Sequence, residues 1–125
     1  MLQWYEIDVP SRTVTQQNAF GASGRYYYFP VIQTDINRNA YLSFGRSSDA
    51  EYGQLRQTGR LVNDAAGQLQ GSALVIAGQG AYSGGRWGDY FGIGRDPSDA
   101  RGVWSYGEYA GSGNTWRTRV AFARF

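Results

Sequence analysis

The sequence predicts an all-β protein built from repeated antiparallel sheets, and three observations support this fold class. The 125 residues include eighteen Gly, ten Tyr, six Phe and four Trp, a composition typical of strands and turns. No long stretch shows the 3.6-residue apolar periodicity of a helix. A pattern also recurs at an offset of 62 positions, which aligns residues 28–31 with 90–93 and residues 41–45 with 103–107. Because strand-and-turn units of this size are typical of propeller blades, we expect a β-propeller type of architecture.

Nine strands are expected, each bounded by residues that favour turns. Alternating apolar residues support the first and last strands, and the third is apolar on both faces, as in a fully buried strand. Pro30 inside the third strand predicts an irregular or edge segment. The expected strands cover residues 4–9, 13–20, 26–34, 40–46, 52–62, 73–76, 89–95, 102–110 and 116–125. The connections rich in Pro, Gly, Asn and Asp cover residues 10–12, 21–24, 35–39, 47–50, 63–67, 80–88, 96–99 and 111–114.

The strand count predicts a single domain, 1–125, that holds about two four-stranded antiparallel blades. Residues 1–24 are interpreted as the outer strands of one blade, 25–82 as a complete blade and 83–125 as the inner strands of the next. Uncovered aromatic edge strands promote aggregation. We therefore expect the ring to be completed by a homo-oligomer, with a trimer of six blades favoured, or by the remainder of a longer parent chain.

Composition excludes several kinds of chemistry. The chain has no Cys and no His, which rules out disulfides, Cys/His zinc sites and a His-based catalytic triad. Its twelve basic residues, all Arg, are scattered and form no run, so no nucleic-acid partner is expected. No segment has the apolar length of a transmembrane helix. The first residues predict a strand rather than a signal peptide.

Four short motifs in the last third of the chain form a recognisable series. They are RWGDY at 86–90, DPSD at 96–99, WSYGEY at 104–109 and WRT at 116–118. The series resembles the C-terminal blades of bacterial exported sialidase-like (BNR-type) β-propeller proteins. Residues 4–7 and 28–30 resemble the preceding blade, so the resemblance covers nearly the whole chain. It implies a bacterial protein that is secreted or held at the cell surface. Residues 111–116 (GSGNTW) lack the Asp of the sialidase Asp-box, which argues against sialidase activity.

The ligand-binding candidates combine charged and aromatic side chains. They are Arg86, Trp87, Asp89, Tyr90, Glu108 and Trp116. The first four are expected at the innermost strand, where they would line the central channel of a propeller or form a purely structural corner. Aromatic residues left over from the core, such as Trp87, Tyr82 or Trp116, are expected to form a pocket that stacks on sugar rings.

Two further sets carry alternative hypotheses. Glu108 with Tyr106 and Tyr109 could form a sialidase-type nucleophile pair, or Glu108 could simply pair with an Arg on a neighbouring strand such as Arg119. Asp35, Asn37 and Asn39 have the 1-3-5 oxygen spacing of a calcium loop. The Gly and Glu that complete such a loop are absent, and tight turns also favour these residue types. Calcium is therefore the weaker hypothesis, and no other cofactor is expected.

These observations predict a non-catalytic binding or assembly module. A carbohydrate or another cell-surface molecule is the expected ligand. A sialidase-like glycoside hydrolase is the alternative from another class, and a structural propeller fragment with no ligand is a third.

Overall fold

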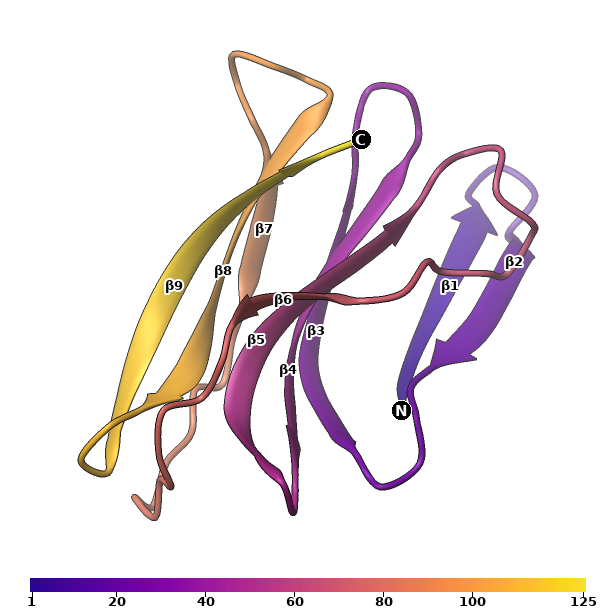
Figure 1. Cartoon of the computed structure of the whole chain (residues 1–125). Coiled ribbons are helices and arrows are strands. Elements are labelled where there is room, and N and C mark those ends of the chain that lie inside the picture. The colour runs from indigo at the N-terminus through magenta and orange to yellow at the C-terminus, as the bar shows by residue number, and fades with distance from the viewer.

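The computed structural model describes all residues 1–125, and it contains nine strands and no helix (Figure 1). The strands are β1 (Leu2–Asp8), β2 (Thr13–Phe20), β3 (Tyr26–Thr34), β4 (Ala40–Ser48), β5 (Glu51–Arg60), β6 (Ala73–Ile76), β7 (Gly92–Arg95), β8 (Gly102–Gly111) and β9 (Thr115–Arg124). The predicted all-β fold class is therefore confirmed. The chain has no helix with the length and apolar character that crossing a membrane requires.

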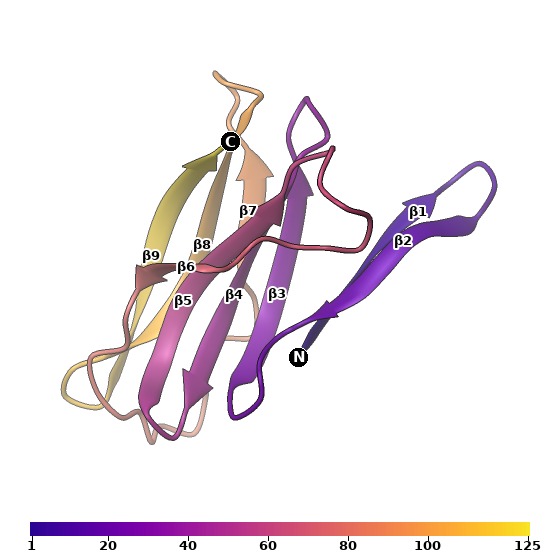
Figure 2. The same cartoon turned by 45° about the vertical axis from the view of Figure 1, so that its right-hand side comes forward.

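The strands form three antiparallel sheets, none of them closed into a barrel. β1 and β2 make a hairpin, β3-β4-β5-β6 a four-stranded sheet, and β7-β8-β9 a three-stranded sheet. These sheets lie within residues 1–24, 25–82 and 83–125. They stack face to face in chain order, with the four-stranded sheet in the middle (Figures 1 and 2). β4 and β5 lie against β8, β3 lies against β7, and β1 lies against β3.

The interface between the hairpin and the central sheet is aromatic. Phe44 on β4 is fully buried, and its ring centroid lies 5.8 Å from that of Phe20 on β2 and 5.5 Å from that of Tyr27 on β3. Leu2 and Trp4 of β1 are buried in the same layer. Burial of a side chain of this size stabilises the fold by about 1.5–3 kcal/mol. This layer therefore holds the hairpin against the central sheet without any shared strand pairing.

The interface between the central and the three-stranded sheet depends on close approach. Leu55 on β5 and Val103 on β8 are both completely buried. A Cβ atom at Gly107 on β8 would lie only 2.5 Å from Leu55 and 2.8 Å from Phe91. Glycine at this position therefore sets how closely the two sheets can pack.

The 62-residue offset aligns strands but not the faces of those strands. Phe44 points toward the hairpin, whereas its counterpart Tyr106 lies on the open face of the three-stranded sheet. The faces that carry Ser43 and its counterpart Ser105 instead meet each other. Gln57, which pairs with Ser43 across the strands, donates a hydrogen bond of 2.6 Å to the Ser105 hydroxyl. If two successive sheets face the same way, residues that point in the same direction must be separated by an odd number of positions in these strands. An even offset such as 62 places them on opposite faces, because a shift of one residue reverses the face of a strand.

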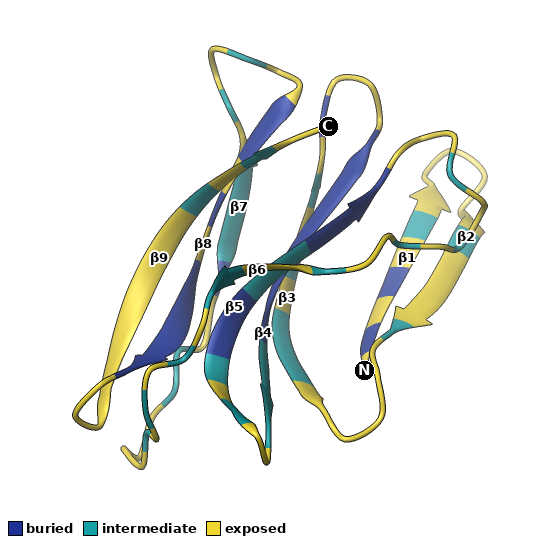
Figure 3. Ribbon diagram, viewed as in Figure 1, coloured by how far each residue is buried: buried dark blue, intermediate teal, exposed yellow.

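The irregularity predicted at Pro30 is confirmed. The register of β3 shifts between Tyr28 and Val31, and Phe29 has a φ of 51°. Proline donates no backbone hydrogen bond, and β3 accommodates it because β3 is an edge strand of its sheet. The prediction that this strand is buried on both faces is wrong. β4 has that position instead, since it lies between the hairpin and the three-stranded sheet (Figure 3).

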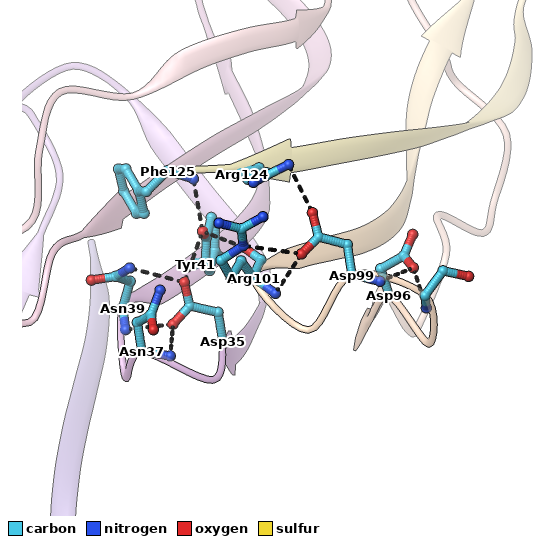
Figure 4. Close-up of polar contacts among 10 residues, drawn as sticks. Asp35, Asn37, Asn39, Tyr41, Asp96, Asp99, Arg101, Arg124 and Phe125 are labelled. Carbon is cyan, nitrogen blue, oxygen red and sulfur yellow. Dashed lines mark hydrogen bonds and ion pairs between the residues drawn. The ribbon is translucent and has the colours of Figure 1, made fainter.

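Asp35 organises the turn between β3 and β4 (Figure 4). Its Oδ1 accepts the backbone N–H groups of Asn37 at 2.8 Å and Asn39 at 2.9 Å. Its Oδ2 accepts the Asn39 side-chain amide at 2.9 Å and the Tyr41 hydroxyl at 3.2 Å. Asp35 is 2% exposed, so its carboxylate is a buried acceptor with four donors around it.

A second aspartate has the same structural role in the turn between β7 and β8. Asp96 accepts the indole N–H of Trp104 at 2.6 Å and the backbone N–H groups of Ser98 and Asp99 at 2.6 Å and 2.9 Å. The bond from Trp104, followed by the backbone bonds, lowers the pKa of Asp96. Both turns thus use an Asp that binds local amides and one aromatic side chain of the following strand.

Most strand ends lie within two residues of the prediction, and two differences are structurally informative. β5 ends at Arg60, because the N–H of Leu61 donates to the Asp64 carboxylate and thereby starts a turn. β7 begins only at Gly92, after a loop in which the N–H of Gly88 donates to the Glu108 side chain. Residues 89–91 therefore belong to a loop and not to the innermost strand.

Candidate functional site

The loop between β6 and β7, residues 77–91, forms the candidate site. It is rich in glycine and crosses the ends of several strands. The backbone N–H of Gln79 donates to the carbonyl of Ala110 at 2.7 Å, and the N–H of Ser83 donates to the Asn114 side chain at 2.7 Å. These bonds attach the loop to β8 and to the β8–β9 turn, so the aromatic side chains of the loop lie beside the central sheet.

Four aromatic side chains surround a pocket of about 470 Å³ between this loop and the central sheet: Tyr28, Tyr52, Tyr82 and Trp87. The Trp87 ring centroid lies 5.4 Å from that of Tyr82 and 6.4 Å from that of Tyr28, the latter in an edge-to-face arrangement. Burial raises the pKa of Tyr28, and a hydrogen bond with Ser47 partly opposes this shift. The pocket therefore has apolar ring faces with tyrosine hydroxyls beside them.

Glycines in neighbouring strands make room for these rings. A Cβ atom at Gly45 would overlap the ring of Tyr28, and one at Gly53 would lie 2.9 Å from the Trp87 ring. Sequence reasoning missed Tyr28 and Tyr52 as pocket residues. The strand glycines Gly45 and Gly53 were the available signal, since glycine inside a strand often marks the close passage of another group.

A second pocket of about 370 Å³ adjoins the first, and Trp87 lines both. Its other lining side chains are Arg86, Asp89, Glu108 and Trp116. The structure thus brings together five of the six predicted ligand-binding residues. The sixth, Tyr90, is 83% exposed and does not line either pocket.

Glu108 is the buried charge of the second pocket. It is 8% exposed, and its Oε2 accepts the backbone N–H of Gly88 at 2.6 Å. Burial raises the pKa of Glu108, the Gly88 bond opposes the rise, and the negative charge of Asp89 adds to it. The expected pairing with Arg119 is wrong, because Arg119 lies opposite Gly107 and therefore on the other face of the sheet.

Arg86 and Asp89 form an ion pair at the rim. Both side chains are largely exposed, at 82% and 54%, so the pair contributes little to stability. It nevertheless neutralises the only arginine that lines the pocket, and no arginine forms an ion pair with Glu108. Asp89 accepts a hydrogen bond from the Arg86 guanidinium in this pair.

The sialidase-type pair does not form around Glu108. Tyr106 shares a face of β8 with Glu108, whereas Tyr109 lies on the opposite face and is buried against the central sheet. A sialidase-type site also needs several arginines around one carboxylate, and Arg86 is the only arginine in this pocket. The structure thus places Tyr106, but not Tyr109, on the same face as Glu108, with one arginine in the pocket.

In the proposed calcium loop, the Asp35 carboxylate already accepts hydrogen bonds from its own turn and from Tyr41. Both oxygens of Asp35 accept hydrogen bonds, as described above, and the Asn39 Oδ1 accepts the N–H of Val62 at 2.9 Å. Asp35 and Asn39 thus use their side-chain oxygens within the turn and beside it, whereas a calcium loop directs such oxygens at the ion. No group of three or more acidic side chains that could hold a metal ion occurs in the chain.

Comparison with protein-family models, with curated proteins and with solved structures gave no match for the chain.

Proposed function

We propose that the chain is a non-catalytic binding module, that its site consists of the two adjoining pockets around Trp87, and that its ligand is a carbohydrate. The observation that carries this proposal is that Trp87 lines both pockets. The first is aromatic, and the second, lined by Arg86, Asp89 and Glu108, is called the polar pocket below. Sugar rings have one apolar face that packs on aromatic side chains, and hydroxyl groups that need placed polar partners.

The size and chemistry of the two pockets support such a ligand. A volume of about 470 Å³ for the aromatic pocket lies within the range typical of small-molecule sites. The second pocket places Arg86, Asp89 and Glu108 next to the same indole. One ring could therefore pack on Trp87 while its hydroxyl groups reach charged donors and acceptors.

The test is glycan binding by Trp87 variants. Trp87→Ala should weaken binding by about 30-fold, because loss of a central aromatic contact costs about 2 kcal/mol or more. Trp87→Phe should retain much of the affinity, since it keeps an aromatic wall. Tyr26→Ala is the control, because Tyr26 is an exposed aromatic side chain that lies outside both pockets. A glycan array that binds nothing, or binding that survives Trp87→Ala, would contradict the proposal and favour a structural fragment without ligand.

We further propose that the nine strands make about two propeller-type blades per chain, with the hairpin and the three-stranded sheet as incomplete blades. In this proposal a second copy of the chain covers the part of the open face of the β7-β8-β9 sheet that carries Trp104 and Phe122, and leaves free the end at which Glu108 and Trp116 line the pocket. This face exposes large apolar side chains: Trp104, Tyr106, Val120 and Phe122. On the central sheet, Trp4 and Phe20 of the hairpin cover the corresponding side. An uncovered apolar surface of the kind found on the three-stranded sheet is rare on a monomer. The remainder of a longer parent chain is the alternative cover.

Molar mass in solution tests this assembly. A trimer would give six blades, and Phe122→Arg should shift the mass toward that of a single chain, because a buried arginine without a partner is costly. Val14→Arg cannot serve as the control for this experiment. Val14 lies on the outer side of the hairpin, and this side would itself meet the next copy. A monomer at high concentration would contradict self-assembly and favour the parent-chain alternative. By resemblance, the assembled protein is proposed to be secreted or held at the bacterial cell surface.

A further inference from the structure

The charge of the polar pocket defines which carbohydrates it can accept. Three ionisable side chains line it: Arg86, Asp89 and Glu108. Arg86 is neutralised by Asp89, and no ion pair involves Glu108. With these charges taken together, the pocket carries one net negative charge, and that charge belongs to Glu108.

The strand register keeps other cations away from Glu108. Its cross-strand neighbour on β9 is Thr118, while Arg117 and Arg119 flank Thr118 and therefore point to the opposite face. Arg124 lies opposite Gly102 at the far end of the strand pair, where it is bonded to an aspartate at 2.8 Å. The uncompensated carboxylate is thus a consequence of strand alternation and not of a missing side chain.

The loop fixes the carboxylate in place. The N–H of Gly88 binds Oε2, and a Cβ atom at position 88 would overlap that oxygen. One oxygen of Glu108 is therefore held by the backbone, and the carboxylate forms part of the pocket wall. Burial and the neighbouring charge of Asp89 raise the pKa of this group, which is the expected behaviour of a carboxylate without a cation.

Two indole side chains complete the environment. Trp87 and Trp116 line the same pocket as Glu108. The face of an indole ring attracts a cation, and the attraction grows when the site is partly desolvated. A carboxylate that shares a pocket with two indoles therefore stabilises a bound positive charge and repels a bound negative one.

We propose that the polar pocket selects the protonated amine of an amino sugar, binds neutral sugars more weakly and rejects sugars that carry a carboxylate. This inference rests on the proposed carbohydrate-binding function, and it specifies the ligand class for the same site. The amine would donate to Glu108 while the sugar ring packs on Trp87.

Calorimetry with three oligosaccharides of equal length tests the inference. They are oligomers of glucosamine, of N-acetylglucosamine and of galacturonic acid, which carry amines, neutral amides and carboxylates. The wild-type chain should bind the amine form about tenfold more tightly than the neutral form, as expected for one charge-assisted hydrogen bond. The acidic form should bind most weakly.

Glu108→Gln separates charge from shape. Its amide oxygen can still accept the Gly88 N–H, so folding, checked by circular dichroism, should be retained. The preference for amine over neutral sugar should then fall toward one, while the neutral sugar still binds. Glu6→Gln is the matched control, because Glu6 lies on the hairpin and pairs with Arg38 outside both pockets, and it should leave the preference unchanged.

The outcomes separate this inference from the proposed function. Binding in which the acidic or neutral sugar equals the amine form, or a preference that persists in Glu108→Gln, overturns the inference while the binding function remains. If none of the three oligosaccharides binds and the glycan array is also silent, the proposed function is overturned and the inference falls with it.

Discussion

Replacement of Tyr41 by Phe should uncouple the central sheet from the C-terminal strand. Tyr41 is 4% exposed, and its hydroxyl lies at the centre of the cluster in Figure 4. It accepts the backbone N–H of Phe125 at 2.9 Å, and it donates toward the Asp35 carboxylate at 3.2 Å and the Arg101 carbonyl at 3.1 Å. One hydroxyl therefore joins β4, the β7–β8 turn and the end of the chain.

The expected loss follows from the groups left without a partner. A neutral hydrogen bond contributes about 1 kcal/mol, one to a charged group contributes more, and a buried donor without an acceptor adds a further penalty. Asp35 retains three other donors, so most of the cost falls on the Phe125 N–H and the Arg101 carbonyl. We expect Tyr41→Phe to lower the free energy of unfolding by about 2 kcal/mol. For a chain of this length, this corresponds to a fall in Tm of about 8 °C.

Urea and thermal unfolding measure this loss, and amide exchange locates it. Exchange of the Phe125 amide should accelerate in Tyr41→Phe, because its acceptor is gone. Tyr106→Phe is the matched control. Tyr106 is 45% exposed and its hydroxyl has no partner in the protein, so the change should stay within about 0.5 kcal/mol. A Tyr41→Phe variant as stable as the wild type, with unchanged exchange at Phe125, would refute the structural role assigned to this hydroxyl.

Three further predictions concern packing, pH and metal. Gly107→Ala should lower the free energy of unfolding by about 1–3 kcal/mol through overpacking. Gly94→Ala should be tolerated, because its Cβ would meet no atom within 4 Å. Equal melting temperatures for the two variants would contradict the close approach of the sheets at Gly107. Because the pKa of Glu108 is raised above its ordinary value of 4.5, its contribution to stability is present below that value and is lost as pH rises through the folded-state pKa. Glu108→Gln should therefore gain stability relative to the wild type between acid and neutral pH, and a difference independent of pH would count against the buried charge. Asp35→Ala should lower the free energy of unfolding by about 3 kcal/mol, because it leaves buried donors unpaired. Millimolar calcium should not change the Tm of the wild type, and a rise in Tm with calcium would restore the metal hypothesis.

Much of the strand pattern could be predicted from local chemistry. All nine strands occur near their expected positions, because turn-forming residues punctuate the chain and aromatic and β-branched residues fill the intervals. The irregularity at Pro30 was also predictable, since proline cannot donate to a strand ladder. Local chemistry failed where a long-range bond competes with the ladder. The start of β7 is the clearest case, because the loop before it is held by a bond from the Gly88 N–H to a side chain that lies 20 positions further along the chain.

The candidate site was only partly accessible to sequence reasoning. The motifs at 86–90, 104–109 and 116–118 predict the cluster of charged and aromatic residues around Trp87, but Tyr90 lies outside both pockets and the motifs do not include Tyr28. Adjacent residues in a loop can point in different directions, and only the path of the backbone decides which of them reach one pocket. The pairing of Glu108 failed for a similar reason, because the register of β8 against β9 places Arg119 on the other face.

The sequence by itself determined that this chain is all-β, where its strands begin and turn, and that a strand-and-turn pattern occurs twice. These features depend on backbone preferences and on alternation along one strand, which are local properties. Only the tertiary structure decided that like faces of the two repeats meet, that Asp35 is a buried acceptor and that Glu108 forms no ion pair. Each of these depends on which face of a strand meets its neighbour, and a single bulge or a change of one residue in a turn reverses that face.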